Sequence, residues 1–208
     1  MFRWSIAGSV AALWLAASPV AAEPFQSFAD ICLATNADAH AGEVAAKGAG
    51  WRDVTAQMAA DMGDMGDIQD AAVYLNFDPA DPAGVSPDQS LEILLTGWGD
   101  GEAVMDIKGT VLDLCGVMSP EVDALTMGKR LTDHLGMPAN TGGEFTYWLY
   151  SRQGDAFVSE AALADAADEV ILAATRARSL YAVYVFEDEG LAGLFVGAVR
   201  PQAKAGDR

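Results

Sequence analysis

The spacing of hydrophobic residues along the chain changes several times, and the changes predict both helices and strands. Phe25, Phe28 and Ile31 repeat at helical spacing, which predicts a short helix over Ser27–Thr35. Alternating apolar residues between glycine-rich turns predict strands instead. The predicted strands cover Ala71–Phe77, Leu91–Trp98, Ala103–Lys108, Thr110–Val117, Phe145–Tyr150, Ala156–Val158, Leu180–Phe186 and Leu191–Val199.

Further helices are predicted where helical spacing of apolar residues meets a start or stop signal. Asp38 is expected to cap a helix over Ala39–Lys47. Ser119-Pro120 is expected to begin another, since a hydroxyl cap followed by proline is a typical helix start. The remaining predicted helices cover Arg52–Met62 and an alanine-rich segment from Ser159 to Arg176.

The order of these elements predicts an α+β fold. The strands are joined mainly by tight turns, which favours an antiparallel sheet over a parallel one. We expect about six to seven strands packed with about three to five helices and held by one disulfide. The length is that of a single domain, which we place over residues 23–200, with a flexible tail over residues 201–208.

The first 22 residues have the pattern of a cleavable secretion signal. Arg3 is their only charge, an uncharged apolar stretch runs from Ile6 to Val20, and small residues precede a cut predicted between Ala22 and Glu23. A retained membrane anchor is the alternative, but a spanning helix needs about 20 apolar residues and this stretch is shorter. We therefore expect a soluble periplasmic or secreted protein.

Cys32 and Cys115 are the two cysteines of the chain. In an oxidising compartment a lone pair of cysteines typically forms a disulfide. Free or metal-binding thiols are the alternative, but the chain has only two histidines, His40 and His134, and zinc sites need denser clusters. The sequence therefore predicts a disulfide from the N-terminal helix to the middle of the sheet, with no metal and no cofactor.

The net charge of the chain is strongly negative. Thirty acidic residues against 12 basic ones give a formal charge of −18. Such a protein repels nucleic acid and anionic membrane surfaces, both of which bind proteins through Lys and Arg. The charge indicates simple solubility or, alternatively, a basic protein partner or bound cations.

One acidic segment is a candidate calcium loop. Asp61, Asp64, Asp67 and Asp70 recur every third residue with glycines between them. Flexible loops rich in carboxylates hold calcium in many proteins. The spacing differs from that of an EF-hand, so a solvated acidic loop is the alternative.

Two aromatic residues form a candidate binding surface. Trp148 and Tyr150 lie on the same side of a predicted strand. An exposed row of this kind is typical of a ligand or partner surface. The alternative is a second packed layer, with a helix on each face of the sheet.

Motifs of common enzymes are missing from the sequence. It contains no nucleophile elbow, phosphate loop or dinucleotide fingerprint, so we predict no catalytic residue. The leading hypothesis is a non-enzymatic binding or accessory protein of the cell envelope, with a protein partner and an inhibitor or immunity protein as one subtype. The alternatives are a hydrolase with two carboxylates converging in a concave pocket, and a calcium-binding protein.

Three short motifs carry a family resemblance. Phe28 with Cys32-Leu33, then Gly50-Trp51, then Cys115-Gly116-Val117 before a helix resemble a group of small, uncharacterised exported bacterial proteins with two spaced cysteines. The resemblance covers most of the chain after the signal. It implies the disulfide and export, and it carries no known activity.

Overall fold

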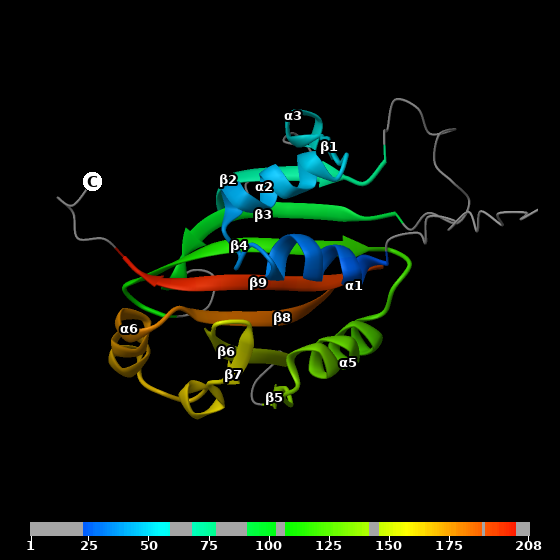
Figure 1. Ribbon diagram of the computed structural model, residues 1–208. Coiled ribbons are helices and arrows are strands. Elements are labelled where there is room, and N and C mark those ends of the chain that lie inside the picture. Colours follow the sequence, from blue (N-terminus) through cyan, green and yellow to red (C-terminus); the bar gives the residue numbers. More distant parts are fainter. Residues whose placement is uncertain are drawn as a thin grey trace, which may run out of the picture.

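A computed structural model of the chain describes residues 23–58, 68–77, 91–102, 107–141, 146–188 and 190–202. Within these ranges nine strands form one antiparallel sheet in the order β1-β2-β3-β4-β9-β8-β6-β5, and β7 pairs with β6 (Figure 1). The strands are β1 (Arg52–Asp53), β2 (Ile68–Leu75), β3 (Ile93–Asp100), β4 (Thr110–Ser119), β5 (Asn140–Thr141), β6 (Thr146–Gln153), β7 (Ala156–Ser159), β8 (Leu180–Asp188) and β9 (Leu191–Pro201).

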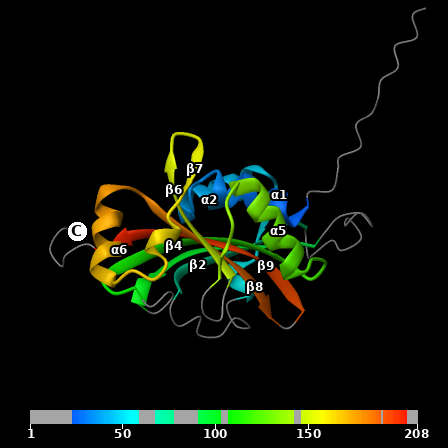
Figure 2. The same cartoon turned by 90° about the horizontal axis from the view of Figure 1, so that it is seen from below.

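Helices cover the sheet unequally. Figure 2 shows α1, α2 and α5 together on one face, which we call the first face, with α6 at one end of the sheet. The helices are α1 (Pro24–Ser27), the π-helical η1 (Phe28–Leu33), α2 (Ala39–Gly48), α3 (Thr55–Met58), α5 (Ala124–Leu135), the 3₁₀ turn η3 (Ala161–Leu163) and α6 (Asp168–Ala177). None of the helices in the described ranges is long and apolar enough to cross a bilayer.

The predicted α+β class and antiparallel sheet are confirmed. The strand count is higher than expected partly because β1 and β5 contain two residues each, too few to leave an alternating pattern. β4 and β9 form the centre, paired from Thr110↔Pro201 to Ser119↔Ala192. Alternate side chains of β9 therefore pack into two different hydrophobic clusters. Val196 packs under the helices of the first face, and Val199 packs in a second cluster that includes part of α6.

The predicted helix start at Ser119-Pro120 is wrong. Ser119 is the last residue of β4, and its hydroxyl accepts a hydrogen bond from the Glu121 N–H at 3.1 Å. The helix begins five residues later at Ala124, where the Asp123 carboxylate accepts from the Thr126 N–H at 2.8 Å. Pairing of β4 with β9 keeps Ser119 extended and fully buried, so the sheet overrides the local helix signal.

Two other predicted helices are shorter than expected, because the first residues of each segment belong to a paired strand instead. The segment predicted as a helix over Arg52–Met62 begins with β1, which pairs with β2, and only Thr55–Met58 is helical in its described part. The segment from Ser159 to Arg176 starts inside β7 and then divides into η3 and α6.

Some predictions fall wholly or partly on residues that the structure does not describe. The signal segment over residues 1–22 lies outside the described ranges, as do most of the strand predicted over Ala103–Lys108 and the tail after residue 202. Pro201 itself is the last residue of β9, and the next residue, Gln202, donates its N–H to the Gly109 carbonyl at 2.9 Å.

The central strand pair depends on a glycine at position 193. A Cβ there would lie 2.2 Å from the Val117 carbonyl oxygen and 2.8 Å from the Met118 Cα, and backbone atoms of a central strand cannot move aside. We expect Gly193→Ala to lower the free energy of unfolding by about 2 kcal/mol, measured by urea denaturation. In the control Gly48→Ala the added Cβ meets nothing within 4 Å. Equal stabilities of the two variants would contradict the prediction.

Candidate functional site

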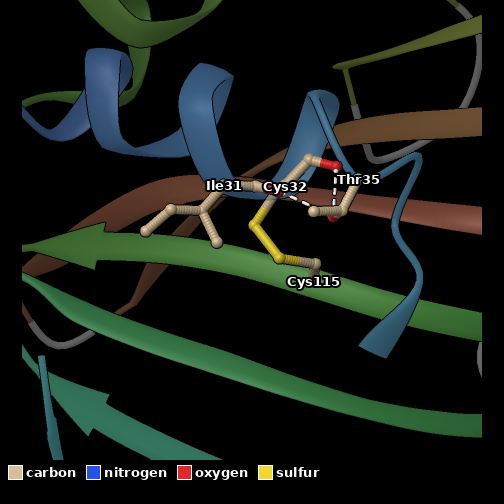
Figure 3. The surroundings of a disulfide bond; sticks show 4 residues. All are labelled: Ile31, Cys32, Thr35 and Cys115. Carbon is tan, nitrogen blue, oxygen red and sulfur yellow. Dashed lines mark hydrogen bonds between the residues drawn. A yellow bond between two sulfur atoms is a disulfide. The ribbon is translucent and has the colours of Figure 1, made fainter. Parts of the chain in front are cut away.

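A disulfide joins η1 to the centre of the sheet. Cys32 and Cys115 are bonded with Cα atoms 5.3 Å apart, and both are fully buried (Figure 3). The Thr35 hydroxyl, one turn later, donates to the Ile31 carbonyl at 2.6 Å. The predicted disulfide is confirmed, and it holds the end of η1 against β4.

The turn between η1 and α2 has an unusual backbone. The N–H groups of Ala34 and Ala37 each donate to the carbonyl five residues earlier, which widens the helix as it ends. Asn36 and Ala37 both have left-handed φ angles, 56° and 58°. For alanine this conformation costs roughly 1–2 kcal/mol. Local strain and π-type turns are frequent at functional sites, which makes this turn a candidate part of one.

Arg152 on β6 holds this turn from the side. One of its guanidinium nitrogens donates to the Asn36 side-chain oxygen at 2.8 Å and to the Leu33 carbonyl at 3.3 Å. The guanidinium also lies 5.0 Å from the centre of the Phe157 ring on β7. The β6–β7 hairpin and the disulfide therefore fix the strained turn from two directions.

A pocket opens beside the turn. It lies between the η1–α2 turn, the C-terminal end of α6 and the neighbouring ends of β8 and β9, and its volume is about 390 Å³. That volume falls within the range of small-molecule sites, about 300–1,000 Å³. Polar side chains dominate the wall, among them Thr35, Asn36, Asp38, Ser179, Tyr181 and Arg200.

Asp38 and Arg200 are the charged residues that line the pocket, and Arg200 also contacts Asp113, which lies just outside the lining. Arg200 forms an ion pair with Asp113 on the neighbouring strand and lies 3.9 Å from an Asp38 oxygen. The other Asp38 oxygen accepts the Ala41 N–H at 2.8 Å and so caps α2. Burial raises the pKa of the Asp113 carboxyl above its ordinary value, and the adjacent Arg200 partly offsets this effect.

The Asp113–Arg200 pair has a measurable consequence for stability. Arg200→Gln leaves the half-buried Asp113 carboxylate without its cation, and we expect a loss of about 1 kcal/mol at pH 8. The loss should shrink as pH falls and Asp113 becomes protonated. Urea denaturation of the two single variants and of Asp113→Asn/Arg200→Gln forms a double-mutant cycle. If Arg200→Gln lowers the free energy of unfolding equally in the wild type and in Asp113→Asn, the ion pair does not contribute to stability.

A second buried carboxyl, that of Glu92, lies outside the pocket. It is fully buried, and neither of its carboxyl oxygens has a hydrogen-bond partner within the described ranges. Burial raises the pKa of Glu92 to about 7; the nearby Ser27 hydroxyl opposes this shift and the Glu121 charge adds to it. Glu92 precedes β3, whereas Asp113 pairs with Trp98 near the other end of that strand. Asp113, and the pocket carboxylate Asp38 that shares Arg200 with it, therefore do not converge with Glu92.

The predicted exposed surface at Trp148 and Tyr150 is wrong. Each side chain is 1% exposed, because both face the helices of the first face. Gly128 of α5 lies over the indole, where an added Cβ would be 3.4 Å from Trp148. Tyr150 stacks on Tyr181 with ring centres 5.2 Å apart, and burial raises the pKa of its hydroxyl far above the ordinary value. The alternative, a packed second layer, is the correct one.

The candidate calcium loop is described only at its end. Asp61, Asp64 and Asp67 lie outside the described residues. Asp70 sits in a β-bulge with φ 49°, and its carboxylate accepts a hydrogen bond from the Trp98 indole N–H at 3.0 Å. Within the described ranges no group of three or more His, Cys, Asp or Glu residues is arranged to hold a metal. Calcium binding by this segment stays a prediction.

The main pocket residues have no distinctive sequence signal. Asp38 is predictable only as a helix cap, and Arg200 stands next to a proline that resembles the start of a tail. Arg200 meets Asp113 because β9 inserts beside β4, which local patterns do not reveal. No protein-family model, curated protein sequence or solved structure matches the chain.

Proposed function

We propose that the protein is an exported, non-enzymatic binding protein of the cell envelope whose binding site is the pocket beside the η1–α2 turn. The observation that carries this proposal is the pocket itself, about 390 Å³ in volume and walled mainly by polar groups. Its wall is held by the disulfide and by Arg152, so it is ordered before a ligand arrives. A preordered site loses less conformational freedom on binding.

The export part of the proposal rests on two observations. The first 22 residues have the pattern of a secretion signal. The disulfide is consistent with an oxidising compartment such as the periplasm. A soluble accessory role outside the cytoplasm agrees with both.

Binding fits the pocket better than the hydrolase alternative. A carboxylate-dependent hydrolase needs two carboxylates poised for proton transfer or attack. Here Asp113 is paired with Arg200, while Asp38 caps a helix and lies near the same guanidinium. Groups engaged in this way are suited to orient a ligand through hydrogen bonds.

A thermal-shift assay tests the proposal. The chain from Glu23 onward would be screened with sugars, amino acids, carboxylic acids and polyamines. A ligand at 100 times its dissociation constant stabilises the folded state by about 2.7 kcal/mol, so a true ligand raises Tm clearly. We expect Asp113→Asn/Arg200→Gln to lose the shift, and NMR of the mixture to show the ligand chemically unchanged.

A control double variant makes the same change in charge away from the pocket. Lys129→Gln/Glu187→Gln also removes one cation and one carboxylate, both from exposed positions that do not line the pocket. It should retain the shift. Loss of the shift in both double variants would point to a nonspecific charge effect, and conversion of the ligand would contradict a non-enzymatic role.

Export can be checked directly. When the full chain is expressed with a bacterial secretion system, we expect the exported protein to begin at Glu23, because small residues precede this position. Intact-mass measurement of the periplasmic fraction reads this out. Recovery of the uncut chain in the membrane fraction would support the anchor alternative.

The charge of the chain favours one further candidate function. A net charge of −18 accelerates association with a basic protein, as expected for an inhibitor or immunity protein. Pulldown from periplasmic extract at about 50 and 500 mM salt tests this candidate. It predicts a basic partner that is retained at low salt and released at high salt, since salt screens exposed charges.

A further inference from the structure

The carboxyl of Glu92 is buried beside the first helix of the described chain. Its side chain is 0% exposed, and neither carboxyl oxygen has a hydrogen-bond partner among the described residues. The Ser27 hydroxyl of α1 lies near it, and the charge that acts on it is that of Glu121, which is also negative. A carboxyl in this environment is stable as a neutral acid, whereas its ionised form is strongly unfavourable.

The backbone of Glu92 is held by its neighbours, so the carboxyl cannot easily leave. The Asn76 side-chain oxygen accepts the Glu92 N–H at 3.0 Å, and the Asn76 N–H donates to the Glu92 carbonyl at 3.3 Å. On one side the Leu91 N–H donates to the Glu121 carboxylate at 3.3 Å, and on the other Ile93 begins β3. If Glu92 ionises, the element that can move is the helix beside it.

The helix α1, which contacts β4 and β9 on the first face, is weakly anchored (Figure 1). It has four residues, buries two of them and has no side-chain cap at its start. Glu23 forms an ion pair with Arg130 of α5, but both side chains are exposed, and exposed pairs contribute little. The Phe25 ring lies 5.7 Å from the Arg130 guanidinium and 5.6 Å from the His134 ring, at the surface of α5.

The segment that follows α1 is fixed. η1 begins at Phe28, which is fully buried, and Cys32 is bonded to Cys115 of β4. A movement that starts at Glu23 therefore stops at Phe28. Because the rest of the fold stays in place, opening of α1 costs less free energy than global unfolding.

We infer that α1 is a pH-sensitive latch: it lies closed on the first face while Glu92 holds its proton, and it opens more often once Glu92 ionises. Opening lets water reach the carboxylate. It also separates Glu23 from Arg130, so the first face presents a different surface when α1 is open. The inference is independent of the proposed binding function, since none of these residues lines the pocket.

The direction of the pH effect follows from proton binding. Burial raises the pKa of Glu92 from 4.5 to about 7 in the closed state, and exposure to water returns the pKa toward its ordinary value in the open state. Opening therefore becomes easier as pH rises from 4.5 to 7, and the effect levels off above about pH 8. We expect the equilibrium constant for opening to rise roughly 50-fold between about pH 5 and pH 8.

Amide hydrogen exchange, followed by NMR on the chain from Glu23 onward, tests the inference. The amides of Gln26 and Ser27 report on α1, since both donate to the Glu23 carbonyl. After correction for the intrinsic pH dependence of exchange, their protection should fall roughly 50-fold between about pH 5 and pH 8. Low urea should leave this exchange unchanged, whereas exchange through global unfolding accelerates with urea.

Two variants assign the effect to Glu92, and a third is the control. Glu92→Gln keeps the size of the side chain and cannot ionise, so protection of α1 should become independent of pH. Glu121→Gln removes the neighbouring negative charge and keeps an oxygen for the Leu91 N–H, so the change in protection should be complete at lower pH. The control Glu23→Gln removes the exposed ion pair and should raise opening at every pH by at most about fivefold, with the same pH profile.

Three results would each overturn the inference. The first is protection of Gln26 and Ser27 that does not change with pH in the wild type. The second is a pH dependence that persists in Glu92→Gln, which would assign it to another group such as His134. The third is exchange of α1 that accelerates with urea as the β4 amides do, which would mean that α1 opens only when the whole chain unfolds. If Glu92→Gln does not fold, an unchanged pH profile in Glu121→Gln contradicts the inference instead.

Discussion

Replacing Cys32 and Cys115 together with alanine lowers the free energy of unfolding by about 4–5 kcal/mol. The two residues are 83 positions apart, and a cross-link that closes a loop of this length removes much of the conformational entropy of the unfolded chain. Domains of this size have stabilities of about 5–15 kcal/mol, so the loss is a large share of the total. Guanidinium denaturation of the oxidised protein and the variant measures the difference.

Reduction provides the control for this experiment. The wild-type protein unfolded and refolded in excess dithiothreitol should match the double variant, since both lack the cross-link. The turn at Asn36 and Ala37 should exchange its amide hydrogens faster in the variant, because η1 is no longer bonded to β4. A stability loss below about 1 kcal/mol would mean that packing of η1 alone holds the first face together.

Glu92→Gln is expected to remove a pH-dependent loss of stability of about 3 kcal/mol. The pKa of Glu92 rises in the folded protein from its ordinary value of 4.5 to about 7. The folded state therefore holds the proton more strongly than the unfolded state does. Stability from this group is fully present below pH 4.5, is lost as pH rises through 7, and is constant above about pH 8.

The measurement is the difference in unfolding free energy between wild type and Glu92→Gln at several pH values. Glutamine keeps the size of the side chain and does not ionise, so the difference should move in favour of the variant by about 3 kcal/mol between pH 4.5 and 8. Glu187→Gln, at an exposed position near the end of β8, serves as the control and should show no such change. If the difference in unfolding free energy between wild type and Glu92→Gln does not change with pH, water reaches this carboxyl in the folded state.

Much of the fold could be predicted from hydrophobic spacing. The last hairpin, the β6–β7 turn and the helix capped by Asp38 each have a local cause in the sequence, and each is present in the structure. The failures are places where pairing between distant strands decides the outcome. Ser119 is extended because β9 lies beside it, although its neighbours favour a helix start.

The site was less predictable than the fold. An aromatic row on a strand looks the same whether it faces solvent or a helix, so Trp148 and Tyr150 could not be assigned from sequence. The pocket residues Asn36 and Arg200, and Asp113 beside Arg200, come from the first turn, the last strand and a middle strand. Their meeting depends on strand order, which tight turns and alternation do not determine.

The strand order also determines when the sheet can be completed. β9, the last strand along the chain, is the only link between the β1–β4 and β5–β8 halves within the described sheet. Each half exposes a long, unpaired central edge until β9 inserts, and such distant pairing is slow. The two cysteines both belong to the segments that precede or form the first half, so their bond can form earlier. A chain with this strand order completes its sheet only after its final strand is available to pair.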